Sequence, residues 1–121
     1  MEKQLLYSES HEWVKWINES EAFVGLSEYA ASQLGDIVYV NIDADEVSLK
    51  DVLGDIESVK AVSDFYSPLE GTVVEVNQEI IDNPALINED SENTWICKIA
   101  NVTNNVKLLS KEEYEAFIKE K

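Results

Sequence analysis

The apolar residues of this chain occur in short runs, and that spacing limits the fold more than any other feature. The runs are rich in valine, isoleucine and aromatic residues, and clusters of Gly, Asn, Asp and Ser separate them. β-branched and aromatic side chains favour extended backbone, whereas the separating residues are typical of turns. Closely spaced strands of this kind are typical of a small β sandwich or barrel. We therefore predict a mostly β fold with strands at 13–17, 22–26, 37–42, 52–59, 72–77 and 95–99.

The last of these strands has an alternating pattern. Trp95, Cys97 and Ile99 would share one face of it, while Lys98 points away. Because Cys97 is the only cysteine and has apolar neighbours, we expect a buried, inert thiol and no internal disulfide.

Two segments interrupt the β pattern with helix signals. Ser27 is a candidate N-cap of a short internal helix that Gly35 would close. Ser110 and Glu113 have the spacing of a capping box, which predicts a C-terminal helix at about 110–120. This helix would pack against the sandwich through an apolar stripe formed by Tyr114, Phe117 and Ile118.

Length and charge limit the class of protein. The 121 residues fit a single domain over 1–121, with an N-terminal hairpin extension before the sandwich. Nine lysines, no arginine and 25 acidic residues give a net charge of −16, which disfavours nucleic acid and anionic membranes as partners. Such a charge favours rapid encounter with basic proteins, although solubility alone would also explain it.

The chain shows no sign of a membrane or secretion signal. No apolar run reaches membrane-spanning length, and the first ten residues resemble neither a secretory signal nor a transit peptide. We expect a cytoplasmic monomer, while a processed organelle protein would have the same appearance. His11, the sole histidine, has no second histidine or cysteine with which to form a metal site, so we expect it to make a structural hydrogen bond.

Lys60 is the most informative single residue. In the stretch ESVKAVSD it is the only basic residue between Lys50 and Lys98, and it falls where a hairpin tip is expected. The nearby carboxylates of Glu57 and Asp64 would stabilise its ammonium form, which disfavours amine catalysis. An exposed, rigidly held lysine suits a modifying enzyme. From the residues alone, however, an ordinary solvated lysine is favoured.

A family resemblance changes that balance. The segments SHEWV, GLSEYAASQLGDIVYV, GDIESVKAVSDFYSPLEGTVVEVN and NPALIN, together with the Trp95 strand, resemble in order the H proteins of the glycine cleavage system. The match spans nearly the whole chain. It implies a lipoyl-domain-like β sandwich, also called a barrel-sandwich hybrid, with lipoate attached covalently to Lys60.

The resemblance also implies a function as a carrier that is not itself an enzyme and has no catalytic residue. The lipoyl arm would take the aminomethyl group of glycine from the pyridoxal-phosphate-dependent glycine decarboxylase (P protein) to the tetrahydrofolate-dependent aminomethyltransferase (T protein). Dihydrolipoamide dehydrogenase (L protein) would then reoxidise the arm. Two alternatives remain open: an H-like protein that stores or relays lipoate to other complexes, and an unmodified acidic adaptor.

Further site residues follow from the resemblance position by position. Glu57 matches the acidic residue that lipoylating enzymes recognise. Gly71 matches a glycine of lipoyl domains, although a bend of the chain near this point would also require it. In the family, the loaded amine lies in a cleft whose wall matches Ser10, Glu12 and Asp64, where carboxylates and a hydroxyl would hold an ammonium group.

The chain departs from the family pattern at two places. Ala44 replaces a glycine that often lies sixteen residues before the lysine, so the turn there must avoid a positive φ or shift by one residue. The loop before Trp95 is the short segment 91–94. We expect either change to affect docking of partners and neither to affect Lys60.

Overall fold

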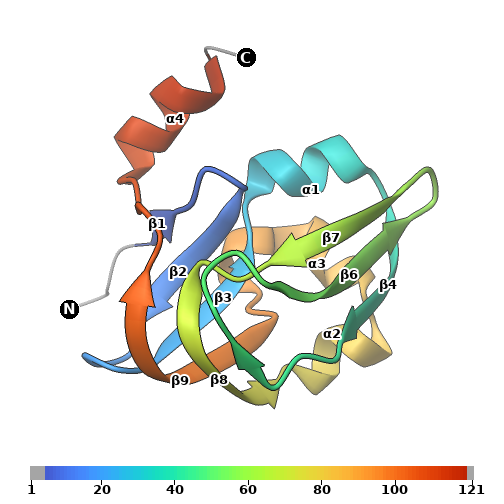
Figure 1. The fold of residues 1–121 in the computed structure, drawn as a ribbon. Helices are drawn as coiled ribbons and strands as arrows, with labels where there is room; N and C mark the ends of the chain where they lie inside the picture. The colour runs from blue at the N-terminus through green and yellow to red at the C-terminus, as the bar shows by residue number, and fades with distance from the viewer. Residues whose placement is uncertain (1–4, 120–121) are drawn as a thin grey trace.

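The structure, a computed structural model that describes residues 5–119, contains two antiparallel sheets built around one main core (Figure 1). The larger sheet has the strand order β1-β2-β3-β9-β8-β5. Its strands are β1 (Leu6–Tyr7), β2 (Glu12–Trp16), β3 (Ala22–Leu26), β9 (Cys97–Asn105), β8 (Leu69–Val76) and β5 (Glu46–Val47). The smaller sheet has the order β4-β6-β7, formed by β4 (Ile37–Ile42), β6 (Val52–Ser58) and β7 (Val62–Tyr66). The predicted mostly β sandwich is confirmed.

The main core lies between the two sheets because each sheet contributes apolar side chains to the same cluster. Val14, Val24 and Ile99 come from the large sheet, and Ile56 and Phe65 come from the small one. All five are almost completely removed from solvent. Burial of β-branched and aromatic side chains from both sheets is the main term that stabilises a sandwich of this size.

The internal helix α1 (Glu28–Leu34) forms as predicted. The Ser27 hydroxyl accepts a hydrogen bond from Ala30 N at 3.1 Å, and Gly35 closes the helix in a left-handed conformation with φ of 82°. Figure 1 shows α1 lying beside β7, along the free edge of the small sheet.

The C-terminal helix α4 (Lys111–Lys119) begins at the predicted capping box. Ser110 N donates to Glu113 Oε1 at 2.9 Å, and Glu113 N donates to Ser110 Oγ at 3.2 Å. The bond from Ser110 N to the Glu113 carboxyl is the largest cause that holds the pKa of this carboxyl below its usual value. The last predicted residue of this helix, Glu120, lies outside the described residues. The helix packs on a second apolar cluster, which contains Tyr7, Trp13, Leu109 and Tyr114.

Three short helical elements were not predicted from the sequence. They are α2 (Gln78–Asp82), α3 (Ala85–Asp90) and the 3-10 helix η1 (Ser91–Asn93). They cover one side of the core, into which Ile80 and Ile87 insert with no exposed surface. Asn77, which we predicted to end a strand, instead caps α2 by accepting a hydrogen bond from Glu79 N.

The predicted strand at 95–99 was wrong at its start. β9 begins at Cys97, and Trp95 packs against Phe23 in the second cluster with ring centroids 4.8 Å apart. Cys97 and Ile99 do face the main core, and burial raises the pKa of the Cys97 thiol to about 12, which agrees with the expected inert thiol. Ala44 adopts no positive φ and packs against the core, so the turn accommodates it without a glycine.

Candidate functional site

Lys60 lies at the tip of the β6–β7 hairpin. The tip consists of Val59 and Lys60, because Ser58 N donates to Ala61 O at 2.8 Å and closes the turn. The Ser58 hydroxyl accepts hydrogen bonds from the backbone N–H groups of Lys60 at 3.3 Å and Ala61 at 3.1 Å. These three bonds fix the backbone that carries the lysine, so the side chain projects from a defined point.

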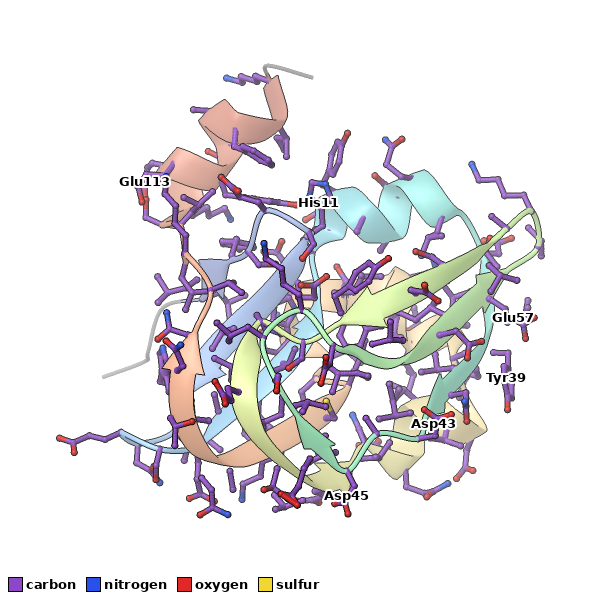
Figure 2. The ribbon with its side chains drawn as sticks, viewed as in Figure 1. His11, Tyr39, Asp43, Asp45, Glu57 and Glu113 are labelled. Atoms are coloured by element: carbon purple, nitrogen blue, oxygen red, sulfur yellow. The ribbon has the colours of Figure 1, made fainter. Side chains whose placement is uncertain are left out.

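The tip is open to solvent. Val59 and Val62 are 69% and 64% exposed, and Lys60 itself is exposed. In the part of the chain that the structure describes, no carboxylate lies within ion-pair distance of Lys60. Glu57 pairs with Tyr39 on one side and Val62 on the other, so these three side chains share the outer face of the small sheet; Figure 2 labels Glu57 and Tyr39 there.

Asn88 of α3 braces the lysine hairpin through the segment between α1 and β4. Val59 N donates to Asp36 O at 2.9 Å, which ties the tip to the segment between α1 and β4. The Asn88 amide holds that segment on both sides: its Nδ2 donates to Gly35 O at 2.8 Å, and its Oδ1 accepts from Ile37 N at 2.8 Å. The sequence reasoning did not assign Asn88 a function, although it ends the NPALIN segment that contributes to the resemblance.

Gly71 lies inside β8 rather than in a turn. The register of β8 against β9 shifts between Glu70 and Thr72, which is the signature of a bulge. A Cβ atom at position 71 would lie 2.6 Å from Ala100 O and 2.9 Å from Ile99 Cγ2, so only glycine permits this close approach of the two strands. The observed surroundings give Gly71 a structural role in the large sheet.

A cleft of about 260 Å³ opens between β7, α1 and the segment that precedes β2. The predicted residues Ser10, Glu12 and Asp64 all line it. Leu26, Leu34, Ile56 and Phe65 form its apolar part. The cleft therefore combines an aliphatic lining with a polar group of two carboxylates and a hydroxyl.

The cleft adjoins the lysine hairpin on two sides. Asp64 lies in β7 four residues after Lys60, so at most about 13 Å of chain separates them. On the other side, the position of a Cβ on Gly35 would lie 3.6 Å from Lys60 Cε, so the lysine side chain passes over the end of α1 next to Leu34. A group attached to Lys60 would start beside Gly35, one residue from Leu34 of the cleft lining.

Glu12 is the chemically unusual residue of the cleft. It is only 2% exposed, and its Oε1 accepts hydrogen bonds from Ser8 Oγ at 2.8 Å and Ser10 Oγ at 2.7 Å. Burial raises the pKa of Glu12 to about 7, against the opposing effect of the two hydroxyl donors. No lysine pairs with it in the described residues. A buried carboxylate in this state would be stabilised by a cation brought into the cleft.

Ser8 is a site residue that the sequence reasoning missed. It has no exposed surface, donates to Glu12 Oε1 and accepts a hydrogen bond from Glu12 N at 3.1 Å. It therefore fixes both the backbone and the carboxylate of Glu12. The signal was present in the sequence as a serine four residues before the glutamate, but spacing alone does not indicate that both would be buried.

His11 makes the expected structural hydrogen bond. Its Nδ1 lies 2.7 Å from the Tyr114 hydroxyl, and its ring packs among Tyr29, Tyr114 and Phe117. Figure 2 shows it between α4 and α1. Its backbone is left-handed, with φ of 76°. This residue ends the turn that precedes β2, and on either side of it Ser10 Oγ and Glu12 Oε1 are joined by a 2.7 Å hydrogen bond.

The described residues hold no cluster of His, Cys, Asp and Glu that could bind a metal ion. Among residues 5–119, no helix has the length and apolar character needed to span a membrane.

A small β sandwich that presents one exposed lysine on a braced hairpin belongs to the class of cofactor-carrying domains. The glycine cleavage H-protein family matches residues 5–121, and the chain therefore belongs to that family. Its function is that of the family: it is a lipoyl carrier of the glycine cleavage system and not itself an enzyme.

Related H proteins align with this chain over nearly its full length. The chain is 44% identical to the glycine cleavage system H protein of Lachnoclostridium phytofermentans, over 97% of this chain and 94% of that protein. It is 48% identical to the H protein of Listeria monocytogenes, over 93% of this chain and 94% of that protein. Among solved structures, the H protein of Mycobacterium marinum superposes with a TM-score of 0.87 at 30% identity, covering 98% of this chain and 99% of that one.

Proposed function

We propose that this chain carries lipoate in amide linkage to Lys60 Nζ and uses the adjacent cleft to protect the aminomethyl group that the arm receives. The observation that carries the proposal is the convergence of Ser10, Glu12 and Asp64 in one cleft at the foot of the lysine hairpin. Bound lipoate would supply the dithiol chemistry by which the one-carbon unit is held and released.

The residues present fit that group. The exposed Lys60 is open to a modifying enzyme, and Glu57 lies on the outer face of the same hairpin, where such an enzyme could read it. Leu34, Ile56 and Phe65 match an aliphatic arm. At the polar end, Glu12 and Asp64 would pair with a terminal ammonium group, and the enclosing walls would exclude water from it.

The partners in this proposal are the lipoylating enzyme, the P protein, the T protein and the L protein. We expect these partners to present basic faces to this chain, because the chain carries a net charge of −16. We further propose that the chain acts as one carrier domain in the cytoplasm, in line with its bacterial and archaeal relatives.

Reconstitution separates a cleavage shuttle from a lipoate relay. The lipoylated chain is mixed with the P, T and L proteins, glycine, tetrahydrofolate and NAD, and glycine-dependent release of carbon dioxide is measured. A shuttle supports release in proportion to lipoylated chain, and the unlipoylated chain is the control. A chain that accepts lipoate but supports no release would be a relay.

The cleft has its own test. Hydrolysis of the loaded arm consumes one water and gives the dithiol, formaldehyde and ammonium. Because Glu12 would stabilise the ammonium group in the closed cleft, Glu12→Gln should release formaldehyde faster than the wild-type chain. An unchanged hydrolysis rate would remove Glu12 from the site.

A further inference from the structure

The C-terminal helix reaches the arm cleft through one hydroxyl group. Tyr114 of α4 places its Oη 2.7 Å from His11 Nδ1 and 2.8 Å from Ser27 Oγ. His11 lies between Ser10 and Glu12, in the wall that approaches β2, whereas Ser27 caps α1, the helix that forms the adjoining wall. The Tyr114 hydroxyl therefore joins the two walls of the cleft.

One assignment of protons satisfies all three groups. Ser27 Oγ accepts from Ala30 N and donates to Tyr114 Oη, and Tyr114 Oη donates to the Nδ1 of a His11 tautomer that carries its proton on Nε2. Burial raises the pKa of the Tyr114 phenol to about 12, which keeps it a donor at neutral pH. The bonds thus run from α1 through Tyr114 to His11.

A second bond between the walls already exists in the backbone, since Ser27 N donates to His11 O at 3.0 Å. This bond continues the β2–β3 pairing of Glu12 with Leu26, so the two backbones are already joined here, and Tyr114 adds a link between the His11 and Ser27 side chains. The left-handed backbone of His11 is a sparsely populated conformation for a residue with a side chain, so it depends on the contacts that hold the ring.

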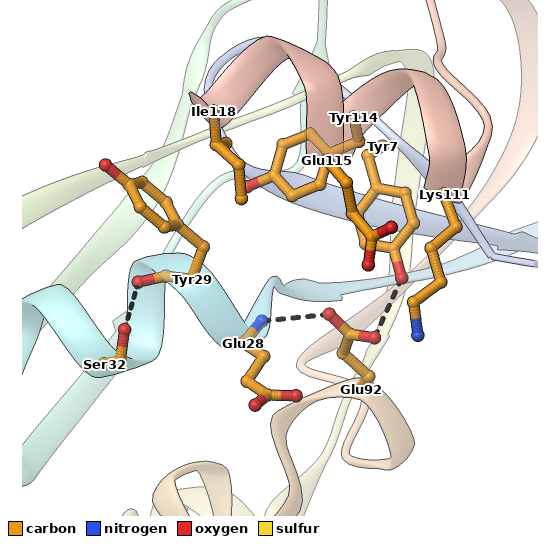
Figure 3. Close-up of a pocket in the computed structure, with 9 residues that line it drawn as sticks. All are labelled: Tyr7, Glu28, Tyr29, Ser32, Glu92, Lys111, Tyr114, Glu115 and Ile118. Atoms are coloured by element: carbon orange, nitrogen blue, oxygen red, sulfur yellow. Dashed lines mark hydrogen bonds between the residues drawn. The ribbon is translucent and has the colours of Figure 1, made fainter. Parts of the chain in front are cut away.

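Tyr114 itself is held rigidly. It is 3% exposed and stacks on Tyr7 with ring centroids 4.5 Å apart and an interplanar angle of 8°. Figure 3 shows the stacked pair and the separate bond of the Tyr7 hydroxyl, which donates to Glu92 at 2.8 Å. The two phenols are alike in burial and packing. Tyr114 bonds His11 directly, whereas the Tyr7 hydroxyl bonds Glu92, whose second carboxylate oxygen accepts from Glu28 N at 3.1 Å at the start of α1.

We propose that Tyr114 is a positioning residue for the arm cleft: its hydroxyl fixes the His11 wall against α1 and so sets how long a loaded arm is protected from water. This proposal rests on the proposed function of the cleft. It gives the C-terminal helix, which lies outside the sandwich, a function in retaining the cargo.

The test compares Tyr114→Phe with Tyr7→Phe, two variants that each lose one buried phenolic hydroxyl from the same cluster. Both are lipoylated, loaded with the aminomethyl group and then followed by formaldehyde release in the absence of partners. Tyr114→Phe should release formaldehyde on the order of fivefold faster than wild type, while Tyr7→Phe should match wild type. Both should accept lipoate at the wild-type rate, because Lys60 lies on a hairpin that neither residue contacts in the hydrogen-bond network described above.

A second variant guards against a general loss of structure. His11→Gly tolerates the left-handed backbone and removes the Nδ1 partner of Tyr114, and it should accelerate release as Tyr114→Phe does. Equal release rates in wild type, Tyr114→Phe and His11→Gly would overturn the inference. If Glu12→Gln also failed to accelerate release, the cleft itself would be wrong; if Glu12→Gln alone accelerated it, only the function of Tyr114 would be wrong.

Discussion

Glu12 shows most clearly how a single residue depends on its surroundings. From its place beside Trp13, it would be an ordinary outward polar residue of a strand. The structure buries both, because α4 and its cluster cover Trp13 while the cleft encloses Glu12. The alternation of buried and exposed side chains fails here because neither face of this part of β2 is open to water.

Glu12→Gln should change the pH dependence of stability. Because the pKa of Glu12 is raised from 4.5 to about 7 in the folded chain, the folded state binds this proton more tightly than the unfolded state. Stability from this group is therefore fully present below about pH 4.5 and is lost as pH rises through 7, by on the order of 3 kcal/mol. Urea unfolding of both proteins between these limits should show the wild type losing stability relative to Glu12→Gln. A constant difference would contradict the burial argument.

Ser8→Ala should raise the pKa of Glu12 further. The Ser8 hydroxyl stabilises the ionised carboxylate, so its loss favours the protonated form, and the buried N–H of Glu12 also loses its acceptor. We expect a loss of about 1–3 kcal/mol in the free energy of unfolding. Carbon-13 NMR titration of the Glu12 carboxyl measures the pKa, and Ser20→Ala in the exposed turn is the control. A carboxyl that titrates as in wild type would show that Ser8 has no influence on Glu12.

At the scale of helices and strands, the sequence predicted the elements that have clear capping residues or a clear apolar pattern. Ser27, Ser110 and Glu113 cap their helices as expected, and β2, β3, β4, β6 and β8 begin and end within three residues of the predicted bounds. β9 runs six residues past its predicted end, and β1, β5 and β7 were not predicted as strands. The helices α2 and α3 were missed because each has only five or six residues. Helices this short show too little of the 3.6-residue period to distinguish them from loops, and tertiary packing of Ile80 and Ile87 stabilises them.

The residues of the candidate site were predicted from the family resemblance, but the residues that hold them in place were not. Lys60, Ser10, Glu12 and Asp64 came from matching motifs, and the structure brings the last three into one cleft. Ser8 and Asn88 act through hydrogen bonds to segments distant in sequence or to buried atoms, which no local pattern shows.

Asn88→Ala should weaken the hairpin as a substrate for lipoylation. The change removes both hydrogen bonds to the 35–37 segment, to which Val59 N is bonded, so the tip should move more freely. We expect slower lipoylation of Lys60 at limiting enzyme and faster hydrogen exchange at Val59 N. Asn93→Ala removes an amide that donates to Asp90 at 2.9 Å, away from the 35–37 segment, and is the matched control. If exchange at Val59 rose equally in both variants, the brace would have no specific effect on the hairpin.

At the scale of the whole molecule, the net charge of −16 is the feature most relevant to partner binding. The one ion pair found within residues 5–119 joins Lys98 to Glu21 at 3.8 Å, so the excess of carboxylates is not neutralised internally. Uncompensated surface charge acts over about a Debye length and accelerates encounter with oppositely charged faces.

Association with the proposed partners, the P and T proteins, should therefore slow as salt rises. Between ionic strengths of about 10 mM and 1 M, the association rate constant should fall by at least tenfold while the dissociation rate constant changes less. Stopped-flow measurement with a labelled chain tests this. Association rates that do not depend on salt would assign the acidity to solubility alone.

The central claim is that the lysine at the hairpin tip carries the cofactor. Intact-mass spectrometry after incubation with a lipoylating enzyme, lipoate and ATP tests it most directly. The wild-type chain should gain one lipoyl group, peptide mapping should place it on Lys60, and Lys60→Arg should gain none. A wild-type chain that stays unmodified, or a Lys60→Arg chain that still gains a lipoyl group, would contradict the account.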